Sequence, residues 1–244
     1  MNLIKKTGIV ICQRTYRESD KMLTLFLKDL GKINSYVHGA KKLNNKLFCA
    51  SQTFLYAQFL LRENKNFYSI DQIDIIENLS PKNYINFCYA TYFCELVDKY
   101  LMQNEPANNI LILLVKTLKI LNSQIDTQYI ARIFEFKFMK LNGFEAQTNF
   151  CHNCHQLKNQ MYFDENGVVC KNCLDPTKTF CKISPNAINL LNHLVHTKFN
   201  ELITYSFEKS IIKELITPSR IFIYSNLEIN LNSKKFICEI ENSK

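Results

Sequence analysis

The chain has 244 residues, of which 47% are hydrophobic and 21% are charged. This is the composition of an ordinary folded protein, so collagen-like, low-complexity and disordered classes are excluded. The formal net charge is +8, from 30 Lys and Arg against 22 Asp and Glu, and it favours an anionic partner. Residues 1–80 hold 12 basic and 7 acidic residues, so most of the excess (+5) lies at the N-terminal end.

Residues 4–78 contain short β-branched and aromatic runs between turn residues, which is the pattern of strands. Gly31 lies in a hairpin turn, where it is free to take a positive φ. Five antiparallel strands in about 75 residues suit a small closed barrel such as the OB-fold. The expected strands are 7–15, 21–27, 33–39, 54–62 and 66–77.

At Pro81 the hydrophobic period changes from two to 3.6 residues, with Ser80 as the expected N-cap. Gly143 is expected to end the third of the helices that follow. A second pair of cap and first helical residue, Ser184 and Pro185, begins a further helix. The expected helices are 81–101, 107–121, 127–141 and 186–199, and a helical tail follows, although a strand over 221–231 stays open.

The apolar stretches are far shorter than the about 20 residues that span a bilayer. No small-residue cleavage site follows the N-terminal segment, so a secretory signal is not expected. The sequence therefore predicts a cytoplasmic protein with no membrane association.

Four of the ten cysteines form two Cys-x-x-Cys pairs, which are separated by fifteen residues. Two residues between thiolates let one tight turn present both sulfurs to a tetrahedral ion, so the spacing predicts one structural Zn2+. The predicted ligands are Cys151, Cys154, Cys170 and Cys173, and residues 161–169 between the pairs are expected to form a hairpin. Substitution of one ligand by His152, His155 or Cys181, and four free thiols, are the alternatives.

Four cysteine ligands leave no open coordination position for water or substrate, so a catalytic zinc is disfavoured. The sequence also lacks a Gly-rich phosphate-binding loop, a His-Glu-x-x-His motif and a Gly-x-Ser-x-Gly motif. An enzyme is therefore not expected.

Basic residues recur along the predicted barrel, with Tyr16 and Tyr36 interleaved among them. Cations combined with aromatic rings on a barrel hold single-stranded nucleic acid without sequence preference. The alternative is an ordinary solvated surface. The candidate DNA-binding residues are Arg14, Arg17, Lys21, Lys32, His38, Lys41, Lys42 and Lys46.

Short motifs along nearly the whole chain occur in an order that resembles the RecO family of bacterial DNA repair proteins, in its zinc-binding branch. The motifs are RESDKMLTLF at 17–26, LGK at 30–32, HGAKK at 38–42, ELVD at 95–98, RIFE at 132–135, LNGF at 141–144, GVVC at 167–170 and NSKK at 232–235. Asparagine dilutes the basic loop at 43–46, which indicates weaker or more salt-sensitive DNA binding than is usual in the family.

The resemblance implies an OB-fold that binds single- and double-stranded DNA. It also implies annealing of complementary strands without ATP, and recombination-mediator work with RecR that helps RecA to load. A nucleoid-associated location in the cytoplasm follows from this role. The leading alternative is a zinc-stabilised protein-docking module without DNA activity.

The family also binds the acidic, apolar-ended tail of the single-strand DNA-binding protein on its helical domain. A cation beside apolar side chains suits such a tail, so we nominate Ile130, Arg132 and Phe134 as its site. The alternative is an ordinary amphipathic helix with a surface arginine.

The expected fold class is therefore α+β. An N-terminal five-stranded OB-fold barrel (residues 1–79) precedes a helical domain (80–149 and 182–244), which carries a four-cysteine zinc-binding insertion (150–181).

Overall fold

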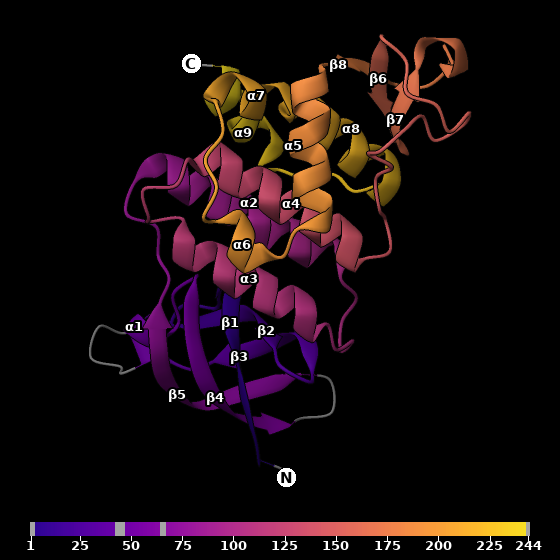
Figure 1. The fold of residues 1–244 in the computed structure, drawn as a ribbon. Helices are drawn as coiled ribbons and strands as arrows, with labels where there is room; N and C mark the ends of the chain where they lie inside the picture. Colours follow the sequence, from indigo (N-terminus) through magenta and orange to yellow (C-terminus); the bar gives the residue numbers. More distant parts are fainter. Residues whose placement is uncertain (1–2, 42–46, 64–66, 243–244) are drawn as a thin grey trace. The chain divides into compact units, whose positions relative to one another are not determined.

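The computed structural model describes residues 3–41, 47–63 and 67–242 (Figure 1). Contacts divide the chain into two compact units, Met1–Ser123 with Leu231–Lys244, and Gln124–Asn230. The boundaries of these units differ from those of the expected domains, because helices that follow the barrel in sequence pack with it. Within the described residues, no helix is both long and apolar enough to cross a bilayer.

The first unit begins with a five-stranded barrel, which confirms the predicted mixed α and β class. Its strands close in the order β1-β2-β3-β5-β4, and β3 and β5 pair in parallel through Ser35 with Tyr68 and Tyr36 with Ser69. The strands are β1 (Leu3–Tyr16), β2 (Asp20–Leu27), β3 (Gly31–Val37), β4 (Leu55–Glu63) and β5 (Tyr68–Asn78).

The barrel core is mainly aliphatic, with Val10 and Leu25 packed around Phe59, all without solvent exposure. A register shift in β1 between Val10 and Cys12 changes the face on which alternate side chains lie. As a consequence, Arg14 and Tyr16 near the end of β1 are exposed to solvent.

The turn before β3 requires glycine, as the sequence predicts. Gly31 has a φ of +77°, and a Cβ atom there would lie 2.0 Å from the carbonyl oxygen of Glu105. Both the backbone conformation and the close approach exclude a larger residue.

In its described residues the same unit holds the helices α1 (Leu47–Ala50), α2 (Tyr84–Tyr100), α3 (Asn108–Ile120) and α9 (Lys234–Asn242). Helix α2 begins three residues later than Pro81, because Asn83 supplies the N-cap by accepting from the Asn86 N–H. Ser80 instead donates from its hydroxyl to the Asn78 side chain, so it is not the cap.

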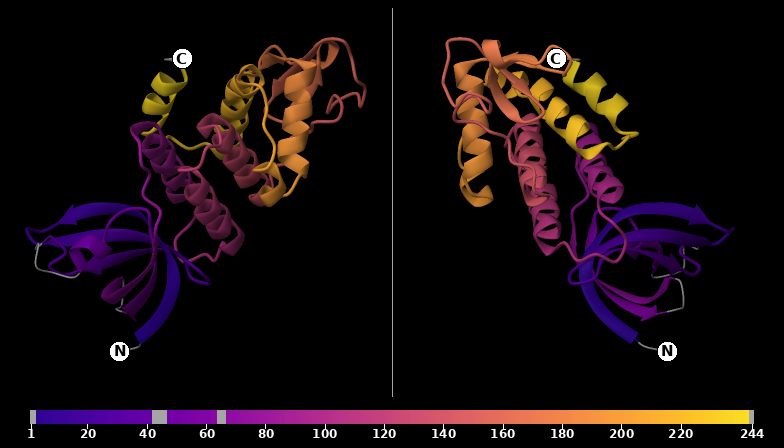
Figure 2. Two further views of the ribbon diagram at one scale, coloured as in Figure 1. Left: turned by 60° about the vertical axis from the view of Figure 1, so that its left-hand side comes forward. Right: turned by 90° about the vertical axis from the view of Figure 1, so that its right-hand side faces the viewer.

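Helix α9 lies beside α2 (Figure 2), although the two are far apart in sequence. The Glu95 carboxylate on α2 accepts from the backbone N–H groups of Asn232 (2.7 Å) and Ser233 (2.8 Å) just before α9. The Tyr89 hydroxyl donates to Glu241 at the other end of α9 (3.1 Å). These contacts connect the ELVD and NSKK motifs.

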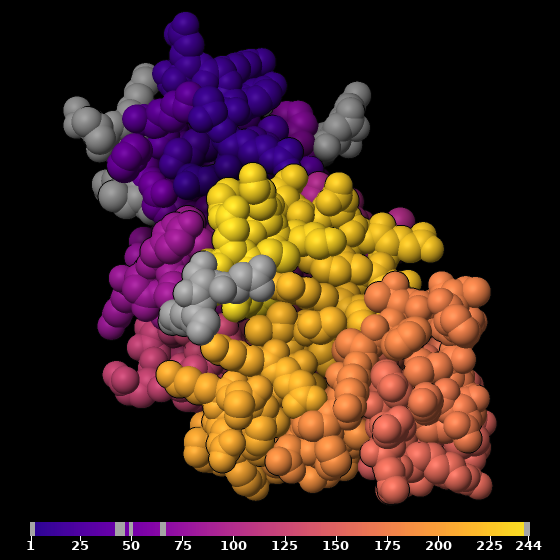
Figure 3. All heavy atoms as spheres, turned by 90° about the horizontal axis from the view of Figure 1, so that it is seen from above, coloured from indigo at the N-terminus to yellow at the C-terminus, as the bar shows by residue number. Residues whose placement is uncertain are grey.

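The second unit contains the remaining helices and a three-stranded sheet in the order β7-β6-β8. Its elements are α4 (Thr127–Leu141), β6 (Met161–Asp164), β7 (Gly167–Cys170), the 3-10 turn η1 (Lys171–Cys173), β8 (Cys181–Ile183), α5 (Pro185–His196), α6 (Phe199–Leu202), α7 (Lys209–Glu214) and α8 (Ile216–Leu227). Because α8 covers most of 221–231, the alternative strand there is wrong. In Figure 3 the insertion forms a salmon-coloured lobe against the orange and gold helices of its own unit.

Candidate metal centre and nucleic-acid interface

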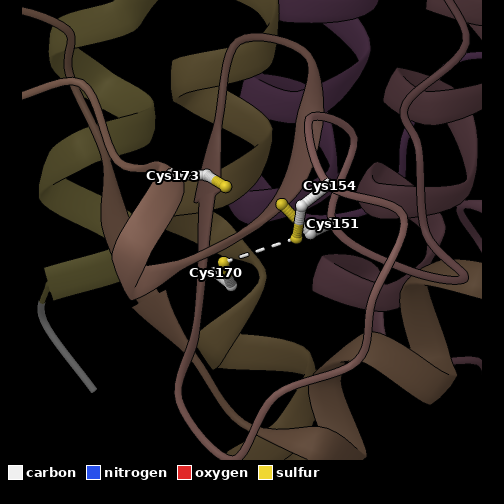
Figure 4. A group of neighbouring side chains, drawn as sticks. All are labelled: Cys151, Cys154, Cys170 and Cys173. Carbon is white, nitrogen blue, oxygen red and sulfur yellow. Dashed lines mark hydrogen bonds between the residues drawn. The ribbon is translucent and has the colours of Figure 1, made fainter.

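The four predicted zinc ligands lie together in the second unit (Figure 4). The ligand atoms of Cys151, Cys154, Cys170 and Cys173 are all within 4.8 Å of one another, and the Cys154 and Cys170 sulfurs are 3.8 Å apart. Zn–S bonds of about 2.3 Å in a tetrahedron place the sulfurs about 3.8 Å apart. The four thiols therefore fit the size of a tetrahedral zinc site.

The β6–β7 hairpin holds the two cysteine pairs near each other. The His152 N–H donates to the Val168 carbonyl (2.9 Å), which fixes the first knuckle to β7. The Asn153 side chain donates to the Cys173 carbonyl (3.3 Å) and so connects the two knuckles. Gly167 closes the hairpin at a φ of +122°, where only glycine is readily accommodated.

The Cys151 and Cys173 thiols have strongly separated pKa values. Burial acts to raise the pKa of Cys151, but backbone N–H groups, including that of Cys154, hold it down at about 6. Hydrogen bonding to Cys170 and then burial raise the pKa of Cys173 to about 12. One thiolate is thus already favoured by the fold, and a divalent cation would favour the other three.

The alternative ligands lie outside this cluster. His152 Nε2 is 2.9 Å from Asp164 Oδ2, so the ring is directed to a carboxylate. Cys181 lies on β8, where burial raises the pKa of its thiol to about 11. In the described parts of the chain, the four cysteines form the single group with metal-ligand geometry.

A second candidate site lies at one end of the barrel, where aromatic rings surround a hollow of about 460 Å³. The Tyr16 and Tyr36 ring centroids are 5.3 Å apart, and those of Tyr36 and His38 are 4.3 Å apart, both edge-to-face. The Arg17 guanidinium lies 5.3 Å from the centroid of Tyr16. Tyr36 is itself buried, whereas Tyr16 and His38 are exposed. Cations beside exposed rings are the side chains that hold unpaired bases.

Asp20 organises the loops around this hollow. Its carboxylate accepts from the Tyr36 hydroxyl and from the Gly39 N–H (2.7 Å). These two hydrogen bonds hold the pKa of Asp20 below its ordinary value. The Lys41 ammonium donates to the Arg17 carbonyl (3.0 Å), so the loop after β3 is also connected to the β1–β2 turn.

The structure separates the candidate DNA-binding residues by exposure. Arg14, Arg17 and His38 are exposed, whereas Lys21 and Lys41 are half-buried. Lys21 donates to the Gln13 side chain (3.0 Å). The remaining candidates Lys42 and Lys46 lie outside the described residues.

Lys32 requires a correction. Its side chain is only 8% exposed, and its Nζ lies 3.3 Å from Asp98 Oδ1 on α2. It therefore connects the barrel to a helix within the first unit and is not available to phosphate.

The nominated peptide site also requires a correction. Ile130, Arg132 and Phe134 are 0%, 1% and 0% exposed. Arg132 Nε lies 2.7 Å from Glu135 Oε2, and the Ser219 hydroxyl donates to the same carboxylate. The expectation of a surface arginine is wrong, because every residue of α4 from Tyr129 to Phe136 is buried, on all faces of the helix.

Sequence reasoning missed Asp20, Met22 and Phe67, which shape or line the barrel hollow. Asp20 could have been found from its place in the RESD motif, since an acidic residue among basic ones requires a local partner. Phe67 carries a weaker signal, namely an aromatic residue next to a polar turn. Met22 had no usable signal, because its exposure depends on the β1–β2 register.

The fold and the cluster define a two-part α+β protein with an N-terminal barrel and four clustered cysteines. Residues 1–79 match the family model described as Recombination protein O N terminal, and residues 81–235 match Recombination protein O C terminal. The chain belongs to the RecO family of DNA repair proteins.

Curated relatives named DNA repair protein RecO are similar along the whole chain. The protein from Acetivibrio thermocellus is 30% identical over 251 residues, which cover 100% of both chains. Those from Bacillus pumilus and Bacillus subtilis are 30% and 27% identical over 246 residues, which cover 99% of this chain and 96% of each relative.

Proposed function

We propose that the protein binds single- and double-stranded DNA, anneals complementary strands without ATP, and acts with RecR to help RecA to load in homologous recombination. The observation that carries the DNA-binding part is the hollow formed by Tyr16, Tyr36 and His38, with Arg17 at its rim. Rings in such a hollow take bases, and exposed cations around it neutralise phosphates.

In this mechanism the protein acts stoichiometrically, and no covalent bond is made or broken. Exposed cations such as Arg14 and Arg17 reduce the repulsion between the backbones of two strands. Complementary bases can then meet and pair. Stacking on the rings holds the bases of a captured strand unpaired until a complementary strand displaces the rings.

A zinc ion held by Cys151, Cys154, Cys170 and Cys173 would be structural in this account. Its chemistry is to neutralise the thiolates and fix the two knuckles. The acidic tail of the single-strand DNA-binding protein remains a proposed partner, without the α4 residues as its site. A cytoplasmic, nucleoid-associated location belongs to the same proposal.

The test is binding of a fluorescent single-stranded oligonucleotide across a salt series. Affinity should fall steeply with salt, and Arg17→Ala should weaken binding and reduce the salt slope by about one, as expected for one lost phosphate contact. Arg62→Ala is a matched control on the same barrel, because Arg62 is paired with Asp71 (2.6 Å). No binding even at low salt would favour the docking-module alternative.

A further inference from the structure

The first unit contains a second hollow, of about 430 Å³, which the proposed function does not use. Its lining combines β1, the length of α2 from Tyr84 to Lys99, and the start of α9. Three exposed rings surround it, with exposed fractions of 67% for Tyr84, 51% for Phe87 and 53% for Phe236. Exposed apolar side chains gathered around one hollow are a mark of a binding site.

The free charge around this groove is positive. Arg14 and Lys99 line it and are exposed, and neither forms an ion pair within the residues that the structure describes. Two carboxylates also line it, but both are engaged. Asp98 is paired with Lys32, and Glu95 accepts the backbone N–H groups that precede α9. The groove thus offers rings and two available cations to a ligand.

The groove is adjacent to the aromatic hollow at the end of the barrel. Arg14, which lines the groove, and Tyr16, which lines the hollow, are two residues apart on β1 and therefore share one face of the strand. Arg14 pairs across β1–β2 with Met22, and Met22 pairs with Tyr36; both lie in the hollow. Arg14 therefore stands where the two sites meet.

We infer that the groove holds the continuation of a single nucleic-acid strand whose other part occupies the barrel hollow. The strand crosses the outer face of β1, with Arg14 at its backbone, and its bases reach Phe87 and the neighbouring rings. This inference rests on the proposed function. Rings and cations repeated along one face fit a chain that repeats bases and phosphates.

The test measures affinity for single-stranded oligonucleotides from about 4 to about 16 nucleotides, the range of site sizes for one OB-fold. In the Phe87→Ala and Lys99→Gln variants, the affinity for the shortest oligonucleotides should be unchanged. The affinity for the longest should fall at least about fivefold, which corresponds to the lower end of the stacking energy of one base on one ring. Phe236→Ala, on a different helix, should behave like Phe87→Ala. Tyr16→Ala should lower the affinity for oligonucleotides of every length.

Matched controls are Ile76→Ala, which removes a 55% exposed apolar side chain from β5, and Lys209→Gln in the second unit. Both should match the wild type, and thermal melts verify that every variant is folded. A groove variant whose affinity is unchanged at every oligonucleotide length, or weakened equally at every length, would overturn the proposed strand path. Unchanged DNA affinity with Phe87-dependent binding of an acidic, apolar synthetic peptide would assign the groove to a protein partner. Absence of DNA binding by the wild type would reject the proposed function itself.

Discussion

Lys32 Nζ lies 3.3 Å from Asp98 Oδ1, and the same ammonium donates to the Asp98 carbonyl oxygen. The two residues belong to separate motifs, LGK and ELVD, and are 66 positions apart in sequence. This pair connects β3 to α2 inside the first unit. The LGK lysine is therefore a structural residue of the barrel–helix contact.

Lys32→Met should destabilise the protein, because it leaves the Asp98 carboxylate largely buried without its cation. The expected loss is about 1–3 kcal/mol of unfolding free energy, measured by urea denaturation. Single-strand affinity of the folded variant should stay at the wild-type value. A loss of affinity at unchanged stability would instead return Lys32 to the DNA interface.

Arg132→Ala should destabilise the second unit by about 3–5 kcal/mol, because it leaves Glu135 buried without its charge partner. The double variant Arg132→Met, Glu135→Leu should recover much of this loss, since it removes both charges. Urea unfolding of the two variants measures the loss and its recovery. Full stability of Arg132→Ala would contradict the buried pair.

The Gly39 amide should report the titration of Asp20. Hydrogen bonds from Tyr36 and Gly39 hold the pKa of Asp20 below its ordinary value of 3.8. The stabilisation from this carboxylate is therefore present above that value and is lost as the pH falls through the lowered pKa. In NMR, the Gly39 amide shift should titrate with a midpoint below 3.8.

Asp20→Asn is the control for that measurement, because it removes the titrating group and keeps an acceptor oxygen. The Gly39 titration should vanish in this variant. A midpoint at or above the ordinary value of an aspartate would show that the loop is not held in this way.

The purified protein should carry one zinc ion per chain, as measured by native mass spectrometry. Cys151→Ser and Cys170→Ser should lose it, and hydrogen exchange should then increase through the β6–β7 hairpin, because the knuckles lose their common ligand. Cys181→Ser is the matched control and should keep the ion. Retention of zinc by either cluster variant would contradict the four-cysteine site.

The barrel and the cysteine site could be predicted because they depend on local patterns. Alternation along the strands, Gly31 in its turn, and the Cys-x-x-Cys spacing are all read within a few residues. Elements of three or four residues, such as α1 and β8, have too few residues to show a period.

The burial of charged residues could not be predicted in the same way. From the sequence alone, Lys32 and Arg132 cannot be distinguished from surface cations. Each is buried by a partner whose position depends on tertiary packing, Asp98 for one and Glu135 with Ser219 for the other. The placement of Arg14 and Tyr16 on the outer face of β1 likewise depends on the register shift in that strand.

Annealing of two complementary single strands, without ATP and across a salt series, tests the central claim most directly. The wild type should accelerate annealing at low salt and lose the effect as salt rises, and the Arg14→Ala, Arg17→Ala variant should lose most of it while Arg62→Ala keeps it. Annealing that is independent of salt and unaffected in the double variant would contradict DNA handling by this face of the barrel.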